Sequence, residues 1–241
     1  MHLAGSALAA VIAAAYVFTA WYPAPYATLA GGSSLFLILM FVDVVVGPAL
    51  TGIIASPRKS HDELKRDVAI IVLLQIFAFS YGIYSLAVAR PVGLVFEVDM
   101  MRVITAADVD TSALAEAPLN LRSLPWNGPR LMAAVKPTER AALFRAVELG
   151  FAGVPLASLP SSWREYAPYQ NEVWKKSKPV AVLIAKYPGV REELAAMAAG
   201  SRQQPAELRF LPLISRQSSW VALVAAPDSR VVGFLPVDGY F

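Results

Sequence analysis

Residues 68–89 read VAIIVLLQIFAFSYGIYSLAVA and contain no charged side chain. At about 1.5 Å per helical residue, this stretch extends roughly 33 Å, enough to cross the roughly 30 Å hydrocarbon core of a bilayer. A surface helix of this length in a soluble protein should carry a polar stripe, whereas this one offers little beyond Gln75, Ser80 and Ser85. The stretch therefore predicts a transmembrane helix.

Two further apolar runs precede this one. Residues 3–21 carry no charge, and residues 34–55 carry one, Asp43. The pair Trp21-Tyr22 ends the first run with side chains that suit a membrane interface. The whole chain is 16% charged, against about 25% for soluble domains. We therefore expect a three-helix transmembrane region over residues 1–90, with spans at about 3–21, 34–55 and 68–89.

The loops predict the direction of the spans. The loop 22–33 has no Lys or Arg, whereas the loop 56–67 has four: Arg58, Lys59, Lys65 and Arg66. Positive residues stay on the cytoplasmic side, so we expect a cytoplasmic N-terminus and a periplasmic domain over 91–241. A cleaved signal peptide is the competing interpretation of residues 3–21, but nothing basic precedes the run, as such peptides require.

Residues 90–241 have an ordinary density of charge, with 17 Lys/Arg and 14 Asp/Glu. In this segment, apolar residues recur at every second position in some stretches, as in strands, and at helical spacing in others. Residues 110–129 and 155–168 show neither pattern and read as irregular. The predicted elements are strands at 92–98 and 102–105 around a turn at 99–101, helices at 138–149, 169–178, 180–186 and 190–199, and a β-meander at 208–213, 220–225 and 231–235. This order indicates a small α+β domain.

Several blocks of the sequence are similar to one family. They are 21–25 (WYPAP), 42–48 (VDVVVGP), 89–92 (ARPV), 95–99 (VFEVD), 102–108 (RVITAAD), 211–213 (LPL), 220–224 (WVALV) and 232–236 (VGFLP). In this order they resemble the TfpX/TfpZ family of type IV pilin accessory proteins over nearly the whole chain. The resemblance implies a non-catalytic, chaperone-like protein of the bacterial inner membrane. It also implies that the partner is a major type IV pilin, whose stability, assembly or dynamics the protein assists.

Asp43 is the sharpest candidate for a functional residue. A carboxylate at span depth costs about 2.5–3.5 kcal/mol on insertion scales and is usually paired or functional. Its structural role would be to cap backbone groups released around Gly47 and Pro48, because proline lacks an N–H. Gln75, Ser80 or Tyr81 of the third span are candidate partners. The functional hypothesis is that Asp43 receives a polar group on the apolar helix of a pilin. The small residues Gly47, Gly52 and Gly82 permit close helix approach, either within the bundle or by a docked helix.

A second candidate is a docking surface in the exported domain. Glu97 and Asp99, at i and i+2 of the first strand, should share one face, and Trp126 and Trp163 lie in proline-rich loops. Exposed aromatics often anchor partners. The structural alternative is that the strand is half-solvated and the tryptophans pack in the core.

The sequence argues against an enzyme. It contains no Cys and only two His, at positions 2 and 61, so the exported domain lacks Ser-His, Cys-His and zinc-site chemistry. There is no glycine-rich phosphate loop, and no basic stripe that would predict nucleic-acid binding. We expect no catalytic residue, metal or cofactor. Two alternatives stay open: a membrane enzyme that modifies pilin or envelope polymers, and a membrane sensor or scaffold. The oligomeric state stays open too.

Overall fold

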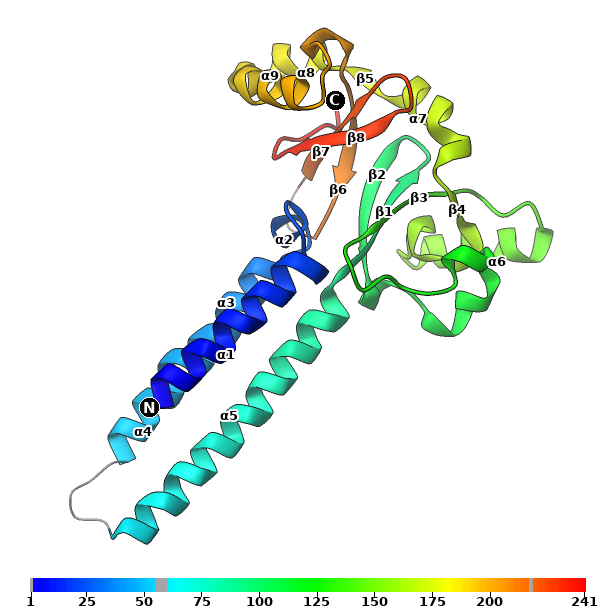
Figure 1. Cartoon of the computed structure of the whole chain (residues 1–241). Coiled ribbons are helices and arrows are strands. Elements are labelled where there is room, and N and C mark those ends of the chain that lie inside the picture. The colour runs from blue at the N-terminus through cyan, green and yellow to red at the C-terminus, as the bar shows by residue number, and fades with distance from the viewer. Residues whose placement is uncertain (1, 55–59, 217–218) are drawn as a thin grey trace. The chain divides into compact units, whose positions relative to one another are not determined.

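A computed structural model describes residues 2–54, 60–216 and 219–241 of the chain (Figure 1). The chain forms two compact units, 1–90 and 91–241. We call them the helical unit and the sheet unit and describe each by itself. The basic residues Arg58 and Lys59, used above to orient the spans, lie outside the described residues.

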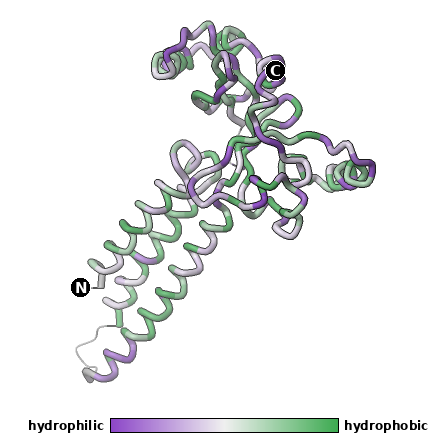
Figure 2. The backbone as a smooth tube through the Cα atoms, turned by 45° about the vertical axis from the view of Figure 1, so that its right-hand side comes forward, coloured by the Kyte–Doolittle hydropathy of each residue, from purple (hydrophilic) through white to green (hydrophobic). Residues whose placement is uncertain are grey.

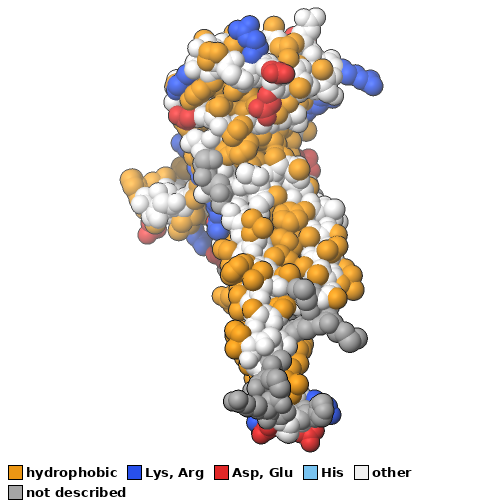
Figure 3. Space-filling model, turned by 90° about the vertical axis from the view of Figure 1, so that its left-hand side faces the viewer, with side chains coloured by type: hydrophobic (Ala, Val, Ile, Leu, Met, Phe, Trp, Pro, Cys, Tyr) orange, Lys and Arg blue, Asp and Glu red, His pale blue; other side chains and the backbone are white. Residues whose placement is uncertain are grey.

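The described part of the helical unit contains three helices long and apolar enough to cross a membrane, Ala4–Trp21, Gly32–Ile54 and Asp62–Ala89. Figure 2 shows them as predominantly hydrophobic tubes, and Figure 3 shows apolar side chains over the outer surface of this unit. Their elements are α1 (His2–Tyr16) with a π-helical end (Val17–Trp21), the short α2 (Tyr26–Leu29), α3 (Gly32–Met40), a π-helical turn (Phe41–Val46), α4 (Gly47–Ile54) and α5 (His61–Ala89). Helices therefore form at all three predicted spans, two of them with earlier starts.

The earlier starts have local causes. The second span begins at Gly32 instead of residue 34, because Gly31 reverses the chain at φ 75° and Gly32 packs under the Tyr22 ring. A Cβ atom at Gly32 would lie 2.4 Å from that ring. The third helix begins at His61, because Ser60 and Glu63 form a reciprocal capping box.

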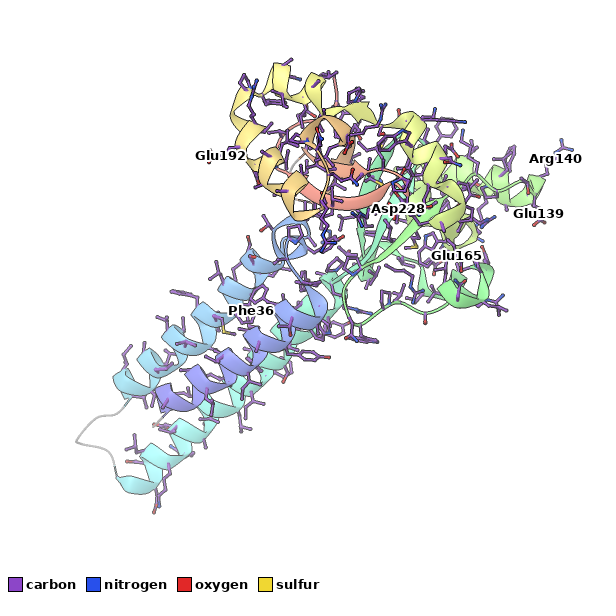
Figure 4. The ribbon with its side chains drawn as sticks, turned by 45° about the horizontal axis from the view of Figure 1, so that its top comes forward. Phe36, Glu139, Arg140, Glu165, Glu192 and Asp228 are labelled. Atoms are coloured by element: carbon purple, nitrogen blue, oxygen red, sulfur yellow. The ribbon has the colours of Figure 1, made fainter. Side chains whose placement is uncertain are left out.

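Close contacts join the spans to one another. The Tyr22 hydroxyl donates to the Leu86 carbonyl at 2.9 Å, which ties the end of the first span to the third. Gly82 faces Leu39, and an added Cβ would lie 2.3 Å from its Cδ1 atom. Phe36, marked in Figure 4, meets Phe18 edge to face at 5.0 Å between ring centres. Small residues and aromatic pairs thus set the helix spacing, as is usual inside lipid.

The sheet unit contains one sheet with helices inserted between its strands. The described strands are β1 (Pro91–Glu97), β2 (Met100–Thr105), β3 (Arg130–Ala134), β4 (Trp163–Glu165), β5 (Lys178–Pro179), β6 (Arg209–Ile214), β7 (Ser219–Ala225) and β8 (Arg230–Leu235). Their order is β4-β3-β1-β2-β6-β7-β8, and β5 pairs with β6. The pairs β1–β3 and β2–β6 are parallel, and the remaining pairs are antiparallel. The unit is therefore a mixed α/β fold.

The helices of this unit are α6 (Arg140–Phe151), α7 (Gln170–Lys176), α8 (Val180–Lys186) and α9 (Arg191–Gly200). Leu183 and Leu194 of α8 and α9 pack on Phe210 and Leu223 of β6 and β7, which makes one buried cluster. A second cluster surrounds Trp163 beneath β1, β2 and β3. Helix α6 belongs to neither cluster and has no buried residue.

The structure corrects two details predicted for this unit and confirms a third. β4 lies in a segment that reads as irregular, and β3 lies in residues for which no element was predicted, because both strands form by pairing with neighbours distant in sequence. The first turn occupies Val98 and Asp99, so Met100 and Met101 belong to β2. The predicted β-meander at the C-terminus does form, as β6, β7 and β8.

Candidate functional site

The candidate site lies in the second span, where the helix widens into the π-helical turn Phe41–Val46. There the N–H of Gly47 donates to the carbonyl of Val42, five residues back. The Asp43 carbonyl would next receive the N–H of residue 48, but that residue is a proline. The Asp43 carbonyl therefore loses its helical donor, and π-helical turns of this kind are frequent at functional sites.

Gln75 of α5 supplies the missing donor. Its Nε2 atom donates to the Asp43 carbonyl oxygen at 3.1 Å. The two helices come this close because residue 47 is a glycine, and an added Cβ would lie 1.7 Å from Gln75 Nε2. Proline at 48 and glycine at 47 thus act together: one releases a carbonyl, and the other admits the side chain that satisfies it. The Gln75 side chain thus satisfies a backbone carbonyl near Pro48, and a capping role for the Asp43 carboxylate itself stays a prediction.

A cleft of about 300 Å³ opens beside this contact. Its lining comes from all three spans: Gly5, Ser6 and Ala9 of α1, Asp43 of the second span, and Val72, Gln75, Ile76 and Phe79 of α5. Asp43 is 7% exposed. The Oε1 atom of Gln75 is buried and accepts no hydrogen bond from the described residues. The polar groups that the cleft presents at this depth are therefore mainly acceptors.

This arrangement favours a ligand that donates hydrogen bonds. A buried carboxylate is stabilised by a cation or a donor, and a buried amide oxygen by a donor. On the α1 side the cleft is lined by the small residues Gly5, Ser6 and Ala9, so a helix of a partner can approach closely there. Among the residues that the structure describes, no group of three His, Asp or Glu side chains is placed to hold a metal.

The predicted membrane residues are partly brought together. Asp43, Gly47 and Gln75 meet, and Pro48 acts through its missing N–H. Ser80 and Tyr81 are exposed on α5. Gly52 has open space around its Cβ position, so it makes no close helix contact among the described residues. Sequence reasoning missed the wall formed by Gly5, Ser6 and Ala9, whose small side chains at helical spacing were an available signal.

The four predicted docking residues do not form one surface. Glu97 is 8% exposed, and its carboxylate accepts from Arg102 Nε at 2.9 Å and from the Leu156 N–H at 2.8 Å. Asp99 lies in the turn and not on the strand face of Glu97. Trp163 is buried, and its Nε1 donates to the Ala157 carbonyl, so it is a core residue. Asp99 and Trp126 remain exposed.

The whole chain is similar in sequence to known fimbrial assembly proteins. The profile of the family described as "Fimbrial assembly protein FimB" matches residues 1–31. The fimbrial assembly proteins of serogroups E1 and I of Dichelobacter nodosus are each 31% identical over 241 residues, covering 100% of this chain and 94% of the relative. The protein of serogroups C1 and C2 is 37% identical over 117 residues, 48% of this chain and 89% of that relative. No solved structure matches.

Proposed function

The chain belongs to the FimB family of fimbrial assembly proteins, and from this premise we propose that it is a non-catalytic, chaperone-like factor that holds a fimbrial subunit in the membrane. The family supports a role in pilus assembly. The resemblance to TfpX/TfpZ accessory proteins narrows the proposed subunit to a major type IV pilin. The observation that carries the proposal is the cleft with Asp43 and Gln75.

The cleft suits an apolar helix that has a donor at matching depth. Inside lipid, association depends on packing and polar pairing, because the apolar surface gains little from leaving hydrocarbon for protein. The small residues Gly5, Ser6 and Ala9 would pack against the subunit helix, and the oxygen acceptors of Asp43 and Gln75 would pair with its donor. A subunit helix would be held reversibly until it joins the growing fibre.

We propose the bacterial inner membrane as the location of the protein. The excess of basic residues in the loop 56–67 supports a cytoplasmic position for that loop and for the N-terminus. The sheet unit would then lie in the periplasm, where it meets the part of the subunit outside the membrane.

The test measures how much subunit remains bound when the Asp43 carboxylate is changed. Full-length chain and cognate subunit are co-expressed, cross-linked in the membrane and purified in detergent. We expect Asp43→Asn to reduce the cross-linked subunit about fivefold and Asp43→Leu to reduce it up to about thirtyfold, since one polar pair is worth about 1–2 kcal/mol in lipid. Ser85→Ala is the control, because Ser85 is partly exposed, does not line the cleft and donates to the Tyr81 carbonyl of its own helix.

Unchanged cross-linking in both Asp43 variants would contradict the proposal. A change in the mass of the subunit on deletion of this chain would instead favour an enzyme that modifies it. Equal loss in Ser85→Ala would point to general damage to the spans and would also count against a specific role for Asp43.

A further inference from the structure

Helix α6 of the sheet unit exposes an apolar stripe. Leu143, Phe144, Val147 and Phe151 are 37%, 76%, 52% and 89% exposed, and none of the twelve residues of α6 is buried. At 100° per residue these four side chains fall within an arc of about 100°, the width of a core-facing stripe. A helix with such a stripe normally buries it, so this stripe is suited to a partner.

A groove runs beside the stripe within the same unit. Its volume is about 450 Å³. One wall is α6, with Leu143, Val147 and Gly150, and the other is the tip of the β1–β2 hairpin with Val98, which is 51% exposed. Figure 4 shows Glu139 and Arg140, at the start of α6, pointing away at the margin of this unit. The groove is therefore open along an apolar helix and an apolar hairpin tip.

The charges in the groove indicate what the occupant carries. Glu97 and Arg102 neutralise each other through a 2.9 Å ion pair, and the second oxygen of Glu97 accepts from Leu156. Lys136 also lines the groove, is exposed, and has no ion pair or hydrogen bond within the described part of the chain. The charged groups of the lining thus sum to −1 + 1 + 1 = +1. An occupant that brings one carboxylate balances this charge.

We infer that this groove binds an apolar, carboxylate-bearing segment of the fimbrial subunit, from the part of the subunit outside the membrane. The inference rests on the proposed function, because that function supplies the partner. It adds a second contact, in a different unit from the Asp43 cleft and with opposite charge preference: the cleft takes a donor, and the groove takes an acid. Two contacts on one subunit would also raise its effective concentration at each site.

The experiment uses the full-length chain co-expressed with the subunit, with a photoreactive benzophenone amino acid at Val147. The matched control places the same amino acid at Val182 of α8, which is 44% exposed and does not line the groove. We expect an adduct between chain and subunit from position 147 at several times the yield from position 182. Mass spectrometry should place the adduct on an apolar segment with an Asp or Glu close by.

A charge test accompanies the adduct. Lys136→Glu should lower the yield from position 147 about fivefold, which corresponds to about 1 kcal/mol at an exposed charge pair. Lys175→Glu makes the same charge change at an exposed site on α7 and should leave the yield unchanged. Both residues are exposed, so neither substitution should impair folding.

Five outcomes would overturn the inference. If the subunit co-purifies with the chain but position 147 gives no more adduct than position 182, the groove is not the contact, and the proposed function stands. If the subunit neither co-purifies nor gives an adduct, both ideas fail. An adduct of two copies of this chain would assign the groove to self-association. An adduct on a basic segment, or a yield unchanged by Lys136→Glu, would contradict the charge argument.

Discussion

At the scale of single residues, the Asp43 carbonyl shows how two helix-disturbing residues make a polar contact in lipid. Pro48 withholds an N–H, Gly47 removes a Cβ, and Gln75 fills the space with an amide that donates to the carbonyl. The contact requires all three residues: Pro48 to release the carbonyl, Gly47 to leave space and Gln75 to donate. Their arrangement also leaves the Gln75 Oε1 atom free to accept from a ligand in the cleft.

Gln75→Leu should lower the free energy of unfolding of the detergent-solubilised protein by about 1–2 kcal/mol, because the Asp43 carbonyl would lose its donor. Gly47→Ala should cost a similar amount, since its Cβ displaces Gln75 from that carbonyl. The double variant should cost little more than either alone. Gly52→Ala, where the Cβ meets open space, is the control. If the double variant instead loses the sum of the two single losses in unfolding free energy, Gln75 and Gly47 do not act through the same contact.

Val98 is a strained residue at the tip of the first hairpin. Its φ is 60°, a value that β-branched residues seldom adopt, and the Asp99 N–H donates to the Glu97 carbonyl across it. Val98→Gly should therefore stabilise the sheet unit by about 1 kcal/mol, after the entropy cost of glycine is subtracted. Hydrogen exchange of the β1 and β2 amides would measure this. Asp99→Gly should not stabilise, and a loss of protection in Val98→Gly would contradict the strain.

At the scale of elements, Glu97 joins three parts of the sheet unit. It ends β1, pairs with Arg102 of β2, and accepts from the Leu156 N–H that follows α6. Glu97→Ala should lower the free energy of unfolding by about 3 kcal/mol, because Arg102 and the Leu156 N–H would both lose a largely buried partner. Asp99→Ala should change it by less than about 0.5 kcal/mol. Denaturant titration of the two variants makes the comparison, and equal effects would show that Glu97 is not structural.

The sequence predicts some of these elements better than others, for physical reasons. The spans follow from composition, because lipid excludes charge over a whole helix, and β6, β7 and β8 follow from alternation and short local turns. β3, with the sequence RLMAA at 130–134, has weak strand propensity and forms by parallel pairing with β1, which no local signal encodes. The burial of Trp163 likewise depends on the fold around it.

The sequence likewise predicts only part of the candidate site. Asp43 and Pro48 stand out from an apolar span by residue type alone. The contact of Gln75 with the Asp43 carbonyl requires the packing of α5 on the second span, which the sequence does not specify. The groove beside α6 was not foreseen, because the amphipathic pattern of 140–151 resembles that of a helix packed on a core.

At the scale of the whole molecule, one chain carries a helical unit and a sheet unit. We propose that the sheet unit lies outside the cytoplasm. A reporter enzyme that is active only in the periplasm should therefore be active when fused after Phe241 and inactive when fused after Arg66. Activity of the reporter restricted to the second fusion would reverse the proposed orientation.

The central claim is that the cleft between the three spans holds the subunit. A photoreactive amino acid at Ile76, which lines the cleft, is compared with one at Leu73, which is similarly exposed on α5 but lies outside the lining. The account predicts a subunit adduct from position 76, mapped to the apolar helix of the subunit and lost in Asp43→Leu, with little adduct from position 73. Equal adducts from both positions, or an adduct from position 76 that Asp43→Leu leaves unchanged, would contradict it.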